Sequence, residues 1–69
     1  MRVTMRAMRV NKGLTQEQLA KMLGVTKATV TNWEKGRSSI DATTFLTLCS
    51  IYDCNTDDII LPERLAKRE

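Results

Sequence analysis

Apolar side chains in the middle of the chain recur at helical spacing in two short runs. Leu19, Ala20 and Leu23 lie at i, i+1 and i+4, which places them on one face of a helix. Val30 and Trp33 lie at i and i+3 in the next run and predict the inner face of a second helix. The positions between them are mostly polar. The pattern therefore predicts two short amphipathic helices that follow one another closely.

Both helices begin and end with residues that are typical of helix termini. A threonine hydroxyl accepts a hydrogen bond from an unpaired N–H of the first turn, so Thr15 can cap the first helix and Thr26 the second. Gln18 lies three residues after Thr15 and completes a capping box. Gly24 and Gly36 follow the two helices and end them. Two short helices joined by so tight a turn predict a helix-turn-helix, whose second helix enters the DNA major groove.

A third apolar pattern precedes this pair and predicts a helix over residues 3–11. Met1, Met5 and Met8 recur at i, i+4 and i+7, the spacing of one helix face. Methionine fills irregular gaps between packed elements. We interpret the three side chains as part of the core.

Two more helices are predicted in the second half of the chain. Asp41 can cap a helix over residues 42–52. Asn55 or Thr56 can cap a short fifth helix that runs through residues 57–61. The inner face of the fourth helix is expected to present Phe45, Leu48, Cys49 and Tyr52. No strand pattern is evident, so the expected fold class is all-α.

The chain has 69 residues, which allows one domain. We expect that domain to span residues 1–61, with residues 62–69 as a charged tail that follows the helix-breaking Pro62. No apolar run is long enough to cross a membrane, and no secretory leader is visible. These features favour a cytoplasmic protein.

Charge is distributed unevenly along the chain. Residues 1–40 hold eight Lys and Arg against two Glu, whereas residues 41–69 hold three Lys and Arg against six Asp and Glu. The basic part contains the predicted helix-turn-helix. A positive surface there would attract phosphate and give a salt-dependent binding term that does not depend on base sequence. Ordinary solvated surface charge is the alternative interpretation, but it does not predict the segregation.

The sequence offers no metal, cofactor or catalytic site. Cys49 and Cys54 are the only cysteines, and the chain has no histidine and no C-x-x-C pair. We interpret the two as small apolar residues of a reduced protein rather than as a disulfide or a metal site. No Gly-rich phosphate loop, nucleophile motif or carboxylate cluster is present, so we expect neither an enzyme nor a small-molecule ligand.

The run GLTQEQLAKMLGVTKATVTNWEKGR resembles the helix-turn-helix of phage repressor and Cro proteins and of bacterial XRE-type regulators. The similarity covers residues 5–61. It implies a compact five-helix, lambda-repressor-like DNA-binding domain with the helix-turn-helix at helices 2 and 3. It also implies a sequence-specific transcription regulator whose third helix enters the major groove. Asp53 stands where the family usually has glycine, at some strain in a left-handed conformation.

The resemblance places the candidate base contacts on the outer face of the third helix. Lysine can donate to guanine O6 and N7, alanine can contact a thymine methyl, and asparagine can pair with adenine. A threonine can bond to either kind of partner, and Lys27 could equally contact phosphate. The candidates are Lys27, Ala28, Thr31 and Asn32.

Further residues match family positions that hold the DNA backbone. Gln16 begins the second helix, where unpaired N–H groups favour phosphate. Arg9 and Glu34 match a family pair that ties the first helix to the third. An exposed pair of this kind contributes about 0–1 kcal/mol, so we interpret it as positioning first. The candidate backbone contacts are Gln16, Thr29, Lys35, Arg37, Ser38 and Arg9.

The expected partner is double-stranded DNA, bound by a homodimer on a pseudo-palindrome whose half-sites are about 34 Å apart. The resemblance implies a dimer surface near the fifth helix and the tail, with Ile60, Leu61 and Leu65 as candidates. Packing within one chain is the alternative for part of this set. An antitoxin-type interaction module that also binds DNA is the alternative function, which the short tail disfavours.

Overall fold

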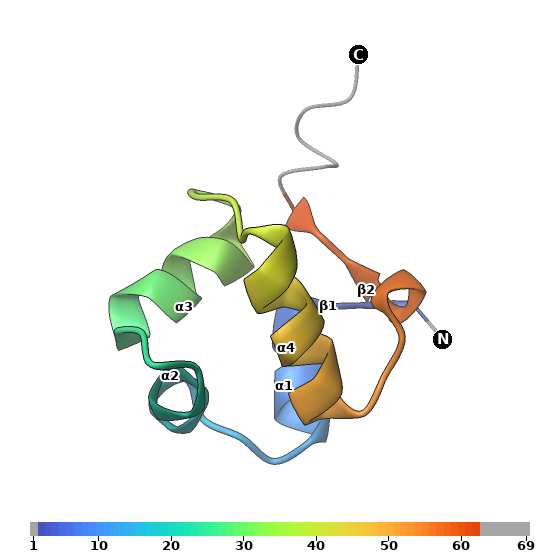
Figure 1. Cartoon of the computed structure of the whole chain (residues 1–69), viewed down its shortest axis with the longest axis horizontal. Coiled ribbons are helices and arrows are strands. Elements are labelled where there is room, and N and C mark those ends of the chain that lie inside the picture. The colour runs from blue at the N-terminus through green and yellow to red at the C-terminus, as the bar shows by residue number, and fades with distance from the viewer. Residues whose placement is uncertain (1, 63–69) are drawn as a thin grey trace.

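The computed structural model describes residues 2–62 as a small helical domain (Figure 1). In Figure 1, α2 and α3 form the left side of the molecule, α1 and α4 lie in the centre, and the two short strands lie on the right. The helices are α1 (Met5–Asn11), α2 (Gln16–Leu23), α3 (Lys27–Lys35) and α4 (Ala42–Tyr52). The remaining elements are β1 (Val3–Thr4), the 3-10 helix η1 (Thr56–Asp58) and β2 (Ile59–Ile60).

The termini predicted for α2 and α3 are confirmed. Thr15 and Gln18 form the reciprocal capping box, with Gln18 N donating to Thr15 Oγ1 at 3.0 Å and Thr15 N donating to Gln18 Oε1 at 2.9 Å. Thr26 Oγ1 accepts from Thr29 N at 3.2 Å. Gly24 (φ 72°) and Gly36 (φ 76°) end the helices in the left-handed region, where a side chain would be strained. The boundaries of the motif thus follow from local sequence.

The prediction for the start of the first helix was two residues too early. Thr4 Oγ1 accepts a hydrogen bond from Ala7 N at 3.1 Å, which makes Thr4 the cap, so the helix starts at Met5. The two residues before it are extended and form β1, which pairs in parallel with β2: Val3 lies opposite Ile59 and Thr4 opposite Ile60. A two-residue strand has no pattern long enough to be found in the sequence.

The expected fifth helix is wrong within the described residues. The chain there forms three residues of 3-10 helix and then an extended pair of isoleucines. Ile59 has φ −114° and ψ 130°, the extended backbone that β-branched residues favour. Pairing with β1 satisfies backbone groups that a helix would otherwise satisfy internally. Residues 2–62 therefore form four α-helices and a short parallel bridge between β1 and β2.

The predicted apolar positions form one core. Met5 and Met8 are 1% and 4% exposed, as their spacing predicts, while Met1 lies outside the described residues. Trp33 is 6% exposed, which confirms its place in the core. The buried apolar set is Met5, Met8, Leu19, Ala20, Val30, Trp33, Ile40, Leu48, Cys49, Tyr52, Ile59 and Leu61. Phe45 and Leu23, also predicted to face inward, are partly buried against it.

Both ends of α4 also follow the sequence prediction. Asp41 caps its start, accepting from Thr44 N at 3.1 Å. Asp53 adopts the left-handed conformation (φ 54°, ψ 51°), and Cys54 N then donates to Cys49 O at 3.0 Å. Both cysteines are free thiols, and burial raises the pKa of Cys49 to about 11. A buried thiol that stays protonated behaves as a small apolar side chain.

Candidate nucleic-acid interface

Packing of α3 against the core fixes which of its residues face outward. Val30 and Trp33 are buried, so the opposite face of the helix is turned to solvent. Lys27 and Ala28 are exposed at its N-terminal end, and Asn32 is half-buried one turn further on. Ala28 and Asn32 lie on the side opposite Val30 and Trp33, and we call them, together with exposed Lys27 at the start of the helix, the outer face of α3. Solvent reaches this face without any rearrangement of the core.

The segment after α3 continues the basic surface. Gly36 turns the chain, and Arg37 N donates to Asn32 O at 2.9 Å, which fixes the second residue beyond the helix. Lys35, Arg37 and Ser38, which the sequence predicts to contact the DNA backbone, are all exposed. Thr29 is half-buried, and its hydroxyl lies 2.9 Å from that of Thr26. Cations and hydroxyls thus extend from the outer face of α3 into the following loop.

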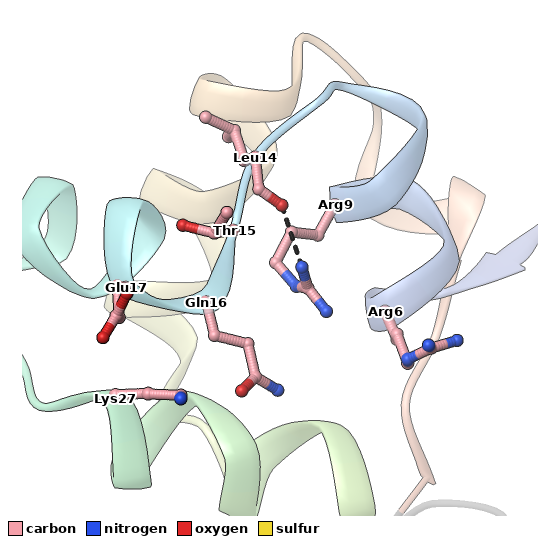
Figure 2. Close-up of a pocket in the computed structure, with 7 residues that line it drawn as sticks. All are labelled: Arg6, Arg9, Leu14, Thr15, Gln16, Glu17 and Lys27. Carbon is pink, nitrogen blue, oxygen red and sulfur yellow. Dashed lines mark hydrogen bonds between the residues drawn. The ribbon is translucent and has the colours of Figure 1, made fainter.

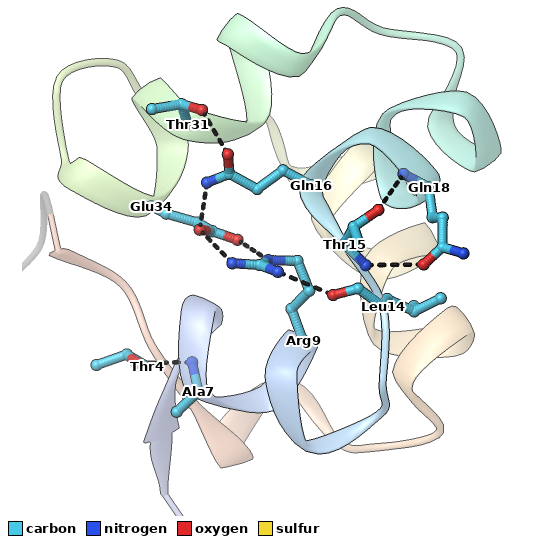
Figure 3. Close-up of polar contacts among 9 residues, drawn as sticks. All are labelled: Thr4, Ala7, Arg9, Leu14, Thr15, Gln16, Gln18, Thr31 and Glu34. Atoms are coloured by element: carbon cyan, nitrogen blue, oxygen red, sulfur yellow. Dashed lines mark hydrogen bonds and ion pairs between the residues drawn. The ribbon is translucent and has the colours of Figure 1, made fainter.

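The predicted pair of Arg9 and Glu34 is confirmed and is bidentate (Figure 3). Arg9 Nε donates to Glu34 Oε2 at 2.7 Å, and Arg9 Nη2 donates to Glu34 Oε1 at 3.3 Å. Arg9 Nη1 also donates to the carbonyl of Leu14 at 2.8 Å. One guanidinium therefore joins α1, the loop before α2, and α3.

Gln16 and Thr31 extend this pair into a four-residue network (Figure 3). Gln16 Nε2 donates to Glu34 Oε1 at 3.0 Å, and Thr31 Oγ1 donates to Gln16 Oε1 at 2.9 Å. We call Arg9, Gln16, Thr31 and Glu34 the polar network. Sequence reasoning predicted DNA contacts for Gln16 and Thr31 but missed these contacts within the chain. In this structure the Thr31 hydroxyl, for which the sequence predicts a base contact, donates its proton to Gln16.

Burial makes the ion pair more important for folding than an exposed pair would be. The Arg9 and Glu34 side chains are only 9% and 3% exposed. Removing one partner of a buried pair leaves an uncompensated charge, which typically costs about 3–5 kcal/mol. Tyr52 lies near this pair, and its hydroxyl is buried without a hydrogen-bond partner among the described residues. Burial, and then the nearby Glu34 carboxylate, raise the pKa of the Tyr52 hydroxyl above its usual range.

An open hollow of about 380 Å³ lies at the N-terminus of α2, between α1 and α3 (Figure 2). Arg6 borders it on one side and Lys27 on the other, with Gln16 between them (Figure 2). Unpaired N–H groups at the start of α2 add partial positive charge. The full lining is Arg6, Arg9, Leu14, Thr15, Gln16, Glu17 and Lys27.

Arg6 is the one cation of this hollow to which the sequence interpretation assigned no role. It precedes Arg9 by three residues, and residues at this spacing share a face of a helix. The spacing alone could therefore have placed Arg6 on the same face of the helix as Arg9. Arg6 is exposed, so its charge is free to act on an anion in the hollow.

Two negative findings apply to residues 2–62. None of the helices formed by them has the length and apolar character needed to span a bilayer. In the same part of the chain, no three His, Cys, Asp or Glu side chains are grouped so that they could hold a metal ion.

Comparison with known proteins identifies the family. A family model described as helix-turn-helix matches residues 5–59, which include all four α-helices and the polar network. Comparisons with curated proteins and with solved structures give no match. The family model implies a DNA-binding regulator of transcription, in agreement with the exposed face of α3 and the cations beside it. The chain belongs to the XRE-type helix-turn-helix family.

Proposed function

We propose that the protein is a sequence-specific, repressor- or Cro-like regulator that inserts α3 into the major groove of its operator. One observation carries the proposal: Ala28 and Asn32 share the outer face of a helix whose phase is fixed by buried Val30 and Trp33, and Lys27 is exposed at the start of the same helix. In the described residues, the Lys27 ammonium forms no hydrogen bond or ion pair. These three side chains are the proposed base contacts.

The proposed backbone contacts surround this face. Arg9 uses three of its five N–H donors within the chain, so two are left for a phosphate oxygen. Arg6 and Lys27 add charge beside it. Phosphate contacts of this kind hold the protein in register without reading sequence. The remaining proposed contacts are Gln16, Thr29, Lys35, Arg37 and Ser38.

Selection of bound duplexes from a random pool tests the proposal. We expect enrichment of one short sequence and an affinity that falls steeply as salt concentration rises. Recovery of duplexes without any shared sequence, at an affinity equal to that for bulk DNA, would contradict sequence-specific binding. A low-salt control with non-specific duplex measures the purely electrostatic part.

We also propose that two chains bind a palindromic operator, because one α3 spans only a few base pairs. Of the three residues predicted for the dimer surface, only Ile60 is both described and partly accessible to a second chain. Ile60 is half-buried, Leu61 is 6% exposed and packs in the core of its own chain, and Leu65 lies outside the described residues. Sedimentation should give two chains per duplex. One chain per duplex at high micromolar protein would contradict the dimer.

The proposed activity is binding alone. We propose that it needs no catalytic step, cofactor or small-molecule ligand and that it takes place in the cytoplasm, where the DNA lies. A regulator of this kind changes transcription by occupying a site. Purified protein should therefore shift its selected duplex without any added factor.

A further inference from the structure

We propose that Thr31 is a positioning residue of the interface, which orients the Gln16 side chain toward a DNA phosphate rather than contacting a base. This inference rests on the proposed function, because it concerns how the same surface meets DNA. It changes the role expected for Thr31 from the sequence. The argument depends on the polar network shown in Figure 3.

The two partners of Gln16 fix which way its amide points. Gln16 Oε1 accepts from Thr31 Oγ1 at 2.9 Å, and Gln16 Nε2 donates to Glu34 Oε1 at 3.0 Å. A flipped amide would place its oxygen against the carboxylate of Glu34, where two acceptors repel each other. Glu34 is itself held by Arg9 at 2.7 Å, so it offers a fixed acceptor. Thr31 supplies the matching donor on the other side.

This orientation leaves one donor of the amide for an external acceptor. The Nε2 group carries two hydrogens, and the described contacts use one of them, toward Glu34. Gln16 also lines the hollow that Arg6 and Lys27 border (Figure 2). The remaining N–H therefore belongs to a surface suited to phosphate oxygens. An amide free to rotate would have to be ordered at the moment of binding, which lowers affinity.

Thr31 itself is poorly placed to choose a base. Its side chain is half-buried, and its one hydroxyl proton is donated to Gln16. Donation to a base would break the bond that orients the amide. Lys27 and Ala28, by contrast, are exposed on the same helix. Base choice thus belongs to the outer face of α3, and Thr31 acts through Gln16.

A double-mutant cycle on full-length protein tests the assignment. Thr31→Val keeps the shape of the side chain and removes the donor, Thr31→Ser keeps the donor, and Gln16→Ala removes the group to be positioned. Affinity is measured on the duplex selected by the parent protein and on all its single-base variants. We expect Thr31→Val to weaken every duplex by the same factor, about three- to tenfold. Thr31→Ser should stay within about twofold, because its hydroxyl can still donate.

Two further readouts separate positioning from general damage. In the Gln16→Ala background, Thr31→Val should have no further effect on affinity. The dependence of affinity on salt should stay that of the parent, because an uncharged amide releases no counterion. A changed base preference at a single position, or equal losses by Thr31→Val with and without Gln16, would overturn the proposal.

The free protein gives a readout that does not need DNA. In an NMR spectrum, the side-chain amide signals of Gln16 should move toward those of a mobile amide in Thr31→Val and stay in place in Thr31→Ser. Unchanged signals in Thr31→Val would overturn the positioning role even if the parent bound no DNA. A parent that binds no duplex would instead contradict the proposed function. If Thr31→Val does not fold, Thr31→Ala serves the same comparison.

Discussion

The helices α2 and α3 start with the same kind of cap, but their first residues differ in what they contact. Thr15 and Thr26 cap the two helices with the same kind of hydrogen bond. The next residue of α2, Gln16, is held by two side chains of α3. The next residue of α3, Lys27, is exposed and forms no such bond within the described part of the chain.

This difference separates two tasks that the sequence alone does not distinguish. Polar groups that are satisfied within the chain position helices, because their geometry is fixed before DNA arrives. Polar groups that face solvent are available to meet base edges. We infer that the polar network holds α3 at its angle to α2, while the outer face of α3 determines which DNA is bound.

Glu34→Ala is expected to have the largest effect, because it breaks the polar network at its centre. The loss leaves the guanidinium of Arg9 buried and unpaired, at a cost of about 3–5 kcal/mol. A core of this size supplies about that much stability, so the variant should be largely unfolded. The urea midpoint followed by circular dichroism measures the effect.

Lys35→Ala, on the exposed end of α3, is the matched control for folding and should keep the urea midpoint of the parent. Equal midpoints for Glu34→Ala and the parent would mean that the network does not hold the helices together.

Arg37→Ala is expected to weaken binding without changing base preference. The side chain is exposed beyond α3, and we propose that it meets a phosphate there. Loss of one phosphate contact should lower the slope of log affinity against log salt by about 0.9. Fluorescence anisotropy at several salt concentrations measures it, with Lys12→Ala at the end of α1 as the charge-matched control. An equal change of this slope in both variants would show that net charge alone, rather than a contact of Arg37, sets the salt dependence of binding.

Tyr52→Phe is expected to have the smallest effect, and in the opposite direction. The hydroxyl is buried beside the polar network but has no hydrogen-bond partner among the described residues. Removing an unsatisfied buried hydroxyl should stabilise the fold by about 1 kcal/mol. Urea denaturation checks this. A destabilised variant would indicate that the hydroxyl has a partner, and Tyr52 would then join the network.

Much of the fold was predictable because its signals are local. The caps at Thr15 and Thr26, the glycine turns and the left-handed Asp53 each depend on a few neighbouring residues. The apolar spacing also located most of the core correctly. The fifth helix failed because Ile59 pairs with Val3, a contact across nearly the whole chain that no local pattern contains.

The sequence indicated which residues lie at the candidate site, but it did not indicate all the residues that they contact within the chain. Lys27 is exposed at the start of α3 and Arg37 just beyond its end, and the pair of Arg9 and Glu34 follows from the family resemblance. The bonds of Gln16 to α3 depend on the angle between two helices, which side-chain packing sets. The sequence pattern therefore assigned Gln16 and Thr31 only to DNA.

The double variant Lys27→Ala/Asn32→Ala tests most directly whether the outer face of α3 determines which DNA is bound. Lys27 is exposed, Asn32 lies on the side of α3 opposite its buried residues, and neither side chain forms a hydrogen bond within the described residues, so the variant should keep the fold of the parent. Selection from the same random pool should give a changed or relaxed sequence, since each base contact contributes about 1–3 kcal/mol of discrimination. Recovery of the parent's sequence with undiminished selectivity would contradict the account.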